Sequence, residues 1–211
     1  MLIRKETEKD YREVETLIRD AFYNVNVPGA TEHYLAHIMR DHQDFIKELD
    51  LVAEIDGTIV GSIMYAKCEL VFENGKTKPC LTFGPLAVHP KYQRKGIGKA
   101  MMLESFKIAK ELGYDSIVIF GHPGNYVSSG FVSSNKVNVC LGENIFPTAM
   151  LVKTLRDNVF DGTKYEYKES SAYEINFIEV EEFDKLFPLK EKKVLPSQEE
   201  FFIYSHSLVN D

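Results

Sequence analysis

The sequence predicts an α/β fold with a mixed, mostly antiparallel sheet, a β-loop-α-β unit and a C-terminal extension. Two tight-turn signals, Asp56-Gly57 and Asn74-Gly75, separate runs rich in β-forming residues and indicate an antiparallel meander. A glycine-containing loop leads from the third run into a helical pattern. An apolar run follows that helix, as is typical of a buried parallel strand. The 211 residues suffice for one main domain.

Two amphipathic helices are expected before the meander. Leu2–Arg4 is a short apolar start that predicts a strand. Thr7–Asp10 resembles a capping box and opens a helix that should continue through Asn24. Thr31 is predicted to cap a second helix, which keeps helical spacing to about Glu48.

The third strand of the meander, Cys80–Val88, carries Gly84-Pro85 in its middle. Proline has no N–H to give to the sheet ladder, and a glycine inside a strand is typical of a bulge. We therefore expect this strand to be locally unpaired at that point.

The second half of the unit consists of a helix and a strand. Ala100–Leu112 has an apolar stripe at helical spacing, and Gly113 is expected to close the helix. The apolar run Asp115–Gly121 should then lie parallel to Cys80–Val88.

The remaining chain has weaker patterns. His122–Phe131 predicts a loop or short helix, and Lys136–Cys140 and Thr148–Val152 predict two further strands. We divide the chain into a domain of residues 1–155 and an appendage of residues 156–211, which would pack on it or beside it. Three tyrosines of the appendage lie in strand-like stretches: Tyr165, Tyr167 and Tyr173.

Composition excludes several classes of function. A net charge of -7 argues against general binding to nucleic acid or an anionic membrane, which needs a broad basic surface. The charged N-terminus lacks the apolar region of a signal peptide, and no apolar run reaches membrane-spanning length, so a cytoplasmic location is expected. Three scattered cysteines, without a Cys-x-x-Cys pair, indicate neither a disulfide framework nor a zinc site.

The loop of residues 89–102 has the character of an anion site. A loop that opens a helix exposes N–H groups without intrahelical partners at the positive end of the helix dipole. Gly96 and Gly98 leave the backbone open to a phosphate, and no acidic residue occurs between His89 and Leu103. The basic residues there are Lys91, Arg94, Lys95 and Lys99. The alternative is an ordinary helix start with surface lysines.

Two common phosphate loops do not fit. A Walker A loop needs glycine where Gln93 stands and a hydroxyl residue where Ala100 follows Lys99. A dinucleotide fingerprint starting at Gly96 would need glycine or alanine at Met101, and it belongs near the first strand of a doubly wound sheet.

The pattern that does fit is Gln93-Arg94-Lys95-Gly96-Ile97-Gly98, preceded by GPLAVHPKY and followed by NYVSSGF. From Leu2 to about Val152 the chain resembles the GNAT superfamily of acetyl-CoA-dependent N-acetyltransferases. The resemblance implies the GNAT fold, with acetyl-CoA as cosubstrate. It implies that backbone amides of the loop bind the CoA pyrophosphate and that the end of the third strand pairs with pantetheine. The cofactor-binding residues expected on this basis are Leu86, Ala87, Val88, Gln93, Arg94, Lys95, Gly96, Ile97, Gly98, Lys99 and Asn125.

The resemblance also assigns chemical roles. A backbone N–H around Leu86–Ala87 would polarise the thioester carbonyl. Tyr126 stands four residues before Gly130, as in the family's Tyr-x-x-x-Gly-Phe pattern, and would protonate the leaving thiol as general acid. The alternative is an aromatic ring that packs against the Gly130-Phe131 turn. Many relatives have an aromatic residue where Asn125 stands; the two alternatives for its amide are a bond to the pantetheine and a role in the turn.

A general base is not identified by the sequence. The candidates are Glu54, Glu69, His122, His33 and His37, acting directly or through water. His33 and His37 lie four residues apart, but without a third ligand a solvated helix face is favoured over a metal site, and no metal is expected.

The predicted function is acetyl transfer from acetyl-CoA to a primary amine of a small molecule or protein, by direct attack in a ternary complex. The alternative is an acyl-CoA-binding sensor or pseudo-enzyme without efficient transfer; transfer of a longer acyl group is a third possibility. The expected partners are acetyl-CoA and the amine acceptor, with no nucleic acid or membrane, and the appendage would cover the acceptor side or support a homodimer.

Overall fold

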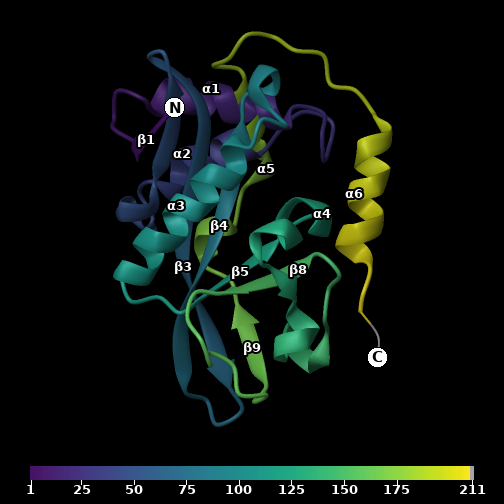
Figure 1. Ribbon diagram of the computed structural model, residues 1–211. Coiled ribbons are helices and arrows are strands. Elements are labelled where there is room, and N and C mark those ends of the chain that lie inside the picture. The colour runs from purple at the N-terminus through teal and green to yellow at the C-terminus, as the bar shows by residue number, and fades with distance from the viewer. Residues whose placement is uncertain (210–211) are drawn as a thin grey trace.

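The computed structural model describes residues 1–209 and has the predicted mixed sheet (Figure 1). Its strands are β1 (Leu2–Lys5), β2 (Leu51–Ile55), β3 (Thr58–Phe72), β4 (Thr77–Val88), β5 (Ser116–Phe120), β6 (Val132–Ser133), β7 (Val139–Cys140), β8 (Met150–Thr154) and β9 (Tyr165–Lys168). Its helices are α1 (Tyr11–Phe22), α2 (Glu32–Met39), α3 (Ile97–Glu111), α4 (Pro123–Tyr126), α5 (Phe177–Asp184) and α6 (Pro196–His206). Over the described residues the strands form one sheet in the order β1-β2-β3-β4-β5-β8-β6, and β9 pairs with β3 and β7.

Helices cover both faces of the sheet because apolar side chains of β2 point alternately to either side. Leu51 and Ala53 pack in the core beneath α3, whereas Val52 packs in the core beneath α1 and α2. Strands β2, β3 and β4 form the predicted antiparallel meander, and β5 runs parallel to β4. Two layers of helix thus enclose the sheet, with α3 in front in Figure 1.

The second helix is shorter than predicted. It ends at Met39 rather than near Glu48, because the next residues turn back to the sheet edge. Ile46 N–H donates to the Tyr65 carbonyl at 3.0 Å, and Lys67 N–H donates to the Asp44 carbonyl at 2.8 Å. These bonds pair residues 44–46 with the part of β3 that follows its pairing with β2. Backbone pairing therefore replaces the expected helix there.

Other predicted boundaries also moved. The helix expected from Ala100 begins at Ile97, so Gly98 and Lys99 belong to its first turn. The strand expected over residues 136–140 is wrong in its first part, because residues 134–137 form a 3₁₀ turn that ends at the left-handed residue Asn138. Only Val139–Cys140 forms a strand there.

Strand β4 diverges from β5 after a short region of pairing. The parallel register joins Leu81 to Ile117, and β4 then continues to Val88 without a partner on its β5 side. On its other side the β3 register is also interrupted, since Ile63 faces Leu86 while Tyr65 faces Phe83. The irregularity expected at Gly84-Pro85 is therefore confirmed, and it leaves the last residues of β4 with a free edge.

The C-terminal segment contributes to the same sheet and to its helical cover. Tyr165 and Tyr167 lie in β9, whereas Tyr173 ends a 3₁₀ turn. The helices α5 and α6 were not predicted. Arg19 of α1 donates to both carboxylate oxygens of Asp184 at 2.6 and 3.1 Å, which ties α5 to α1. The division of the chain at residue 156 stays a prediction, and residues 210–211 of the appendage lie outside the described residues.

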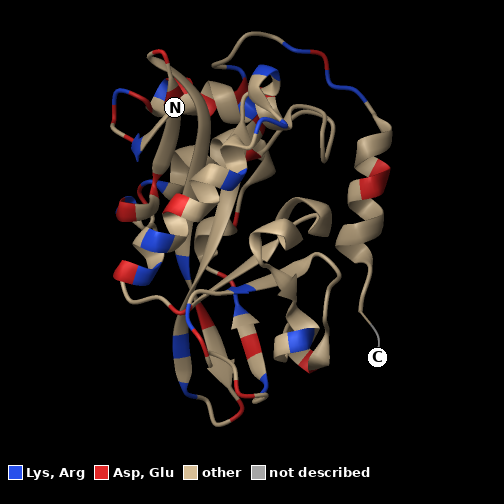
Figure 2. Cartoon of the chain, viewed as in Figure 1, with Lys and Arg blue, Asp and Glu red and all other residues tan. Residues whose placement is uncertain are grey.

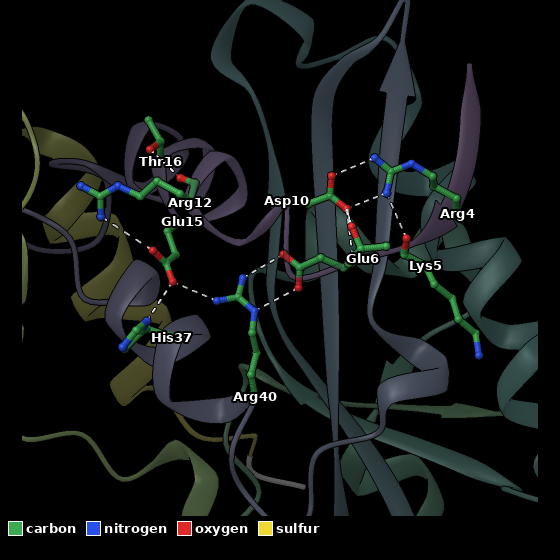
Figure 3. Close-up of polar contacts among 10 residues, drawn as sticks. Arg4, Lys5, Glu6, Asp10, Arg12, Glu15, Thr16, His37 and Arg40 are labelled. Carbon is green, nitrogen blue, oxygen red and sulfur yellow. Dashed lines mark hydrogen bonds and ion pairs between the residues drawn. The ribbon is translucent and has the colours of Figure 1, made fainter.

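A buried ion-pair network fastens α1 and α2 to the start of the sheet (Figure 3). Arg40 donates to the two carboxylate oxygens of Glu6 at 3.0 and 2.8 Å and to Glu15 at 3.0 Å. His37 Nδ1 lies 2.9 Å from the same Glu15 oxygen. Burial, followed by the nearby Glu6 carboxylate, raises the pKa of Asp50 well above its usual range.

Candidate active site

A cleft of about 510 Å³ opens where β4 separates from β5, at the N-terminus of α3. Ten of the twelve residues predicted at the site line it, all except Ala87 and Lys95. The lining residues are Val25, Leu86, Val88, Tyr92, Gln93, Arg94, Gly96, Ile97, Gly98, Lys99, Met102, Asn125 and Tyr126. The predicted residues, which the sequence places in three separate stretches, therefore meet around one space.

The loop before α3 has the backbone geometry of an anion-binding turn. Arg94 and Gly96 have positive φ angles of 61° and 83°, and α3 begins directly after Gly96. Ala100 N–H donates to the Gly96 carbonyl at 2.9 Å, which closes the first turn of the helix. The N–H groups of Ile97, Gly98 and Lys99 precede that bond and have no acceptor within the helix. They are therefore available to a ligand at the positive end of the helix. Figure 2 shows basic residues where the chain enters α3.

The end of β4 presents half of its peptide groups to the cleft. His89 N–H donates to Val60 of β3 at 2.9 Å, so the backbone groups of residue 89 face β3. Because successive peptide groups alternate along a strand, those of Leu86 and Val88 face the opposite, free edge. The side chain of Gln93 donates to the Val88 carbonyl at 3.0 Å, as this orientation requires.

The two predicted residues outside the cleft have other neighbours. Ala87 is 1% exposed, and its side chain packs in the core beneath α1 and α2. The backbone N–H and C=O of Ala87 face β3, where Ala87 pairs with Ser62. Lys95 donates from Nζ to the Lys91 carbonyl at 3.0 Å. Of the two positions expected to polarise the thioester carbonyl, only Leu86 therefore presents its N–H to the cleft.

Tyr126 closes the inner end of the cleft. Its ring packs against Phe83 and Phe131, with ring centroids 5.8 and 5.7 Å apart. Gly121 makes this position possible, because a Cβ there would lie 2.5 Å from Cε2 of Tyr126. The Tyr126 hydroxyl has no hydrogen-bond partner within residues 1–209. Burial, with the Tyr204 side chain as a lesser cause, raises the pKa of Tyr126 to about 12, which keeps the phenol protonated as a donor.

A second cavity, of about 290 Å³, lies on the other side of Tyr126. It shares Val25, Asn125 and Tyr126 with the first cleft. Its lining residues are Phe22, Val25, Asn26, Phe120, Gly121, His122, Asn125, Tyr126, Ala149, Phe201, Tyr204 and Ser205. A molecule in either space would therefore reach the same three residues, which is the arrangement that a reaction between two bound molecules needs.

Of the five base candidates, His122 alone lies at these cavities. Gly124 N–H donates to its Nδ1 at 3.1 Å, so the proton of the neutral ring resides on Nε2. His122 thus presents a donor rather than a free base. Glu54 lies on β2 and accepts from Arg4 at 2.9 Å, and Glu69 lies in the part of β3 that pairs with β9.

The two histidines of α2 each contact an acidic side chain of the protein and line neither cavity. His33 is 0% exposed, and its Nε2 lies 3.1 Å from Asp184. Burial lowers the pKa of His33 to about 4, so it is neutral at neutral pH. His37 contacts Glu15 in the network of Figure 3. Within residues 1–209 no group of three or more His, Cys, Asp or Glu side chains could hold a metal ion.

Several lining residues carry no signal in the sequence. Val25 and Met102 line the cleft, and Phe201 and Tyr204 line the second cavity, yet none belongs to the quoted pattern. Tyr92 could have been predicted from the sequence, because it ends the GPLAVHPKY stretch. The three cysteines are buried free thiols. In the described part of the chain no helix is long and apolar enough to cross a membrane.

Comparison with known proteins gives matches that include the strand-loop-helix part of the cleft. The sequence model described as Acetyltransferase (GNAT) family matches residues 12–132. The chain is 30% identical over 132 residues to the Escherichia coli (strain K12) protein named uncharacterized N-acetyltransferase YhbS, a span of 62% of this chain and 73% of that protein. It is 33% identical over 97 residues to an N-alpha-acetyltransferase of Sulfurisphaera tokodaii, 44% of this chain and 58% of that protein.

Solved structures share the fold. The crystal structure of YhbS from Escherichia coli in complex with CoA has a TM-score of 0.70 at 24% identity, covering 82% of this chain and 91% of that one. A GNAT family acetyltransferase from Brucella melitensis in complex with acetyl-CoA has a TM-score of 0.63 at 22% identity, with 82% and 97% covered.

Proposed function

Because this chain belongs to the acetyltransferase (GNAT) family, and is thus an acyltransferase of the N-acetyltransferase type, we propose that it transfers an acetyl group from acetyl-CoA to a primary amine. The observation that carries this proposal is the meeting of ten predicted residues around one cleft that ends at Tyr126. The relatives solved with CoA or acetyl-CoA support the choice of cosubstrate.

The residues of the cleft fit the parts of acetyl-CoA. The diphosphate would lie on the free N–H groups at the start of α3, where Gly96 leaves open space above the backbone. The peptide-like pantetheine would pair with the free edge of β4 at Leu86 and Val88, as an added strand does. When bound, acetyl-CoA supplies an activated acetyl group as a thioester.

The protein's own groups then stabilise charge and move one proton. The amine nitrogen, uncharged after losing a proton to water, forms the C–N bond while the C–S bond breaks. Leu86 N–H donates to the carbonyl oxygen as negative charge develops on it. Tyr126 gives its proton to the sulfur and regains one from the acetylated nitrogen. A pKa of about 12 makes Tyr126 a weaker acid than a free phenol, so its main contribution is a hydrogen bond held on the departing sulfur.

The test is Tyr126→Phe, measured by thiol release with an amine panel and by calorimetric titration with CoA. We expect kcat to fall about 100-fold while the Kd for CoA changes less than about twofold. Tyr114→Phe, outside both cavities, is the matched control and should match wild type. Unchanged turnover in Tyr126→Phe would contradict the catalytic role, and wild-type protein that binds neither CoA nor acetyl-CoA would overturn the proposed function.

One observation favours the alternative function, an acyl-CoA-binding sensor or pseudo-enzyme. None of the five base candidates offers a free acceptor at the cavities, within the residues that the structure describes. CoA binding without turnover across the amine panel would support the sensor. The cytoplasmic location and the homodimer stay predictions, and an acetyl rather than a longer acyl group is part of the proposal.

A further inference from the structure

The C-terminal helix α6 crosses the second cavity with both ends fastened to the domain. Near its start, Ser197 donates from Oγ to the Val25 carbonyl at 2.9 Å, in the connection between α1 and α2. Just beyond its end, the Ser207 carbonyl accepts from Thr148 N–H at 2.8 Å, before β8. In Figure 1 the helix stands at the side of the domain, next to α4 and β8. The two anchors hold the middle of α6 over the cavity.

The two faces of α6 have different environments. Phe201 and Tyr204 line the cavity, and the Tyr204 ring meets His122 edge-on at 5.1 Å. On the outer face, Phe202 and Ile203 are 55% and 57% exposed. Phe201 and Phe202 are adjacent in the helix, and of the two only Phe201 lines the cavity.

The lining of this cavity is aromatic and uncharged. Five side chains with aromatic carbon rings surround it: Phe22, Phe120, Tyr126, Phe201 and Tyr204. The other lining residues are small, apolar or polar, and no Asp, Glu, Lys or Arg occurs among the described lining residues. Figure 2 shows no charged residue on α4 or β5. Aromatic faces attract a single ammonium group and stack on a flat ring. Further charges on a ligand would lose water without gaining a partner.

We propose that this cavity is the acceptor site and that it selects a primary amine attached to a single aromatic ring, with α6 as the wall that sets the preference. The inference rests on the proposed acetyl transfer. Three observations carry it: the residues shared with the cofactor cleft, the uncharged aromatic lining, and a volume of about 290 Å³, at the small end for ligand sites. Helix α6 lies beyond residues 12–132, which the family model matches, so the family pattern does not include this wall.

The test compares 2-phenylethylamine with spermidine as acceptors for the full chain. We expect kcat/KM to be at least about tenfold higher for 2-phenylethylamine. Phe201→Ala should lower kcat/KM for 2-phenylethylamine about tenfold through a higher KM, while the Kd for CoA stays unchanged. Phe202→Ala, on the outer face of the same helix, is the matched control and should behave as wild type.

Calorimetric titration of 2-phenylethylamine into the CoA-saturated protein gives a readout that does not depend on turnover. Binding that Phe201→Ala weakens and Phe202→Ala retains would support the acceptor site. Equal use of spermidine, absence of amine binding, or equal behaviour of the two variants would overturn it. If CoA binds and amines are acetylated in those cases, the proposed function survives; if CoA does not bind, the proposed function itself fails.

Discussion

The two cavities on either side of Tyr126 differ in how the chain builds them. The first cleft is built mainly from one continuous strand-loop-helix stretch, residues 86–102, with Val25 and residues 125–126 added. The second cavity draws on the end of α1, the end of β5, α4 and the distant helix α6. A local motif therefore defines the first space, whereas only the tertiary fold defines the second. The first should be robust to changes in α6 and the second should not.

The largest expected effect comes from Gly121, which seats the ring that both cavities share. In Gly121→Ala the new Cβ would lie 2.5 Å from Cε2 of Tyr126 and must displace the ring. A displacement near 1 Å at a reacting group can cost about 100-fold in rate, so we expect kcat to fall by that order while CoA affinity persists. Steady-state kinetics and calorimetry measure the two quantities.

A second glycine provides the control for that substitution. A Cβ at Gly142 would lie 3.5 Å from the Glu166 side chain, an ordinary contact, and Gly142 lines neither cavity. Gly142→Ala should therefore keep wild-type kinetics. Equal kinetics in Gly121→Ala would show that Tyr126 does not need its present position.

A smaller effect is expected at the cofactor cleft alone. Gly96 has φ +83°, where a β-branched residue is strained, and it initiates α3. Gly96→Val should weaken CoA binding about tenfold, since strain of this kind costs about 1–3 kcal/mol. Calorimetric titration of CoA gives the change directly.

Gly75→Val is the matched variant for this comparison. Gly75 also has positive φ, +79°, with open space around its Cβ position, but it lies in the turn between β3 and β4. Both variants should lose stability, and only Gly96→Val should lose CoA affinity. A parallel loss in Gly75→Val would mean that the effect is global destabilisation.

The sequence predicted the fold class and most of the residues that line the first cleft, because both depend on short-range patterns. The Asp56-Gly57 turn and the Gly96-Ile97-Gly98 loop act through local backbone geometry, which the residues themselves determine. The expected extension of the second helix failed because Ile46 pairs with Tyr65, a contact that no local pattern reports.

The second cavity could not be predicted for the same reason. Phe201 and Tyr204 line the cavity only because Ser197 and Ser207 hydrogen-bond to loops more than fifty residues away in sequence. His122, one of the base candidates, does line the second cavity, yet its Nδ1 already accepts from Gly124 N–H, a detail of side-chain geometry.

The smallest effect concerns the buried network that holds α1 and α2, and with them one wall of the second cavity. The pKa of Asp50 is raised in the folded chain, so the proton that it retains stabilises the fold fully below the unfolded value of about 3.9, and that contribution is lost as the pH rises toward the folded value. Asp50→Asn removes this dependence, because an amide does not ionise. We expect the variant to gain about 1 kcal/mol relative to wild type for each pH unit between pH 5 and pH 8, measured by urea unfolding. Its CoA affinity should stay unchanged, because the network lies away from β4 and α3; a gain that is independent of pH would contradict the assigned ionisation.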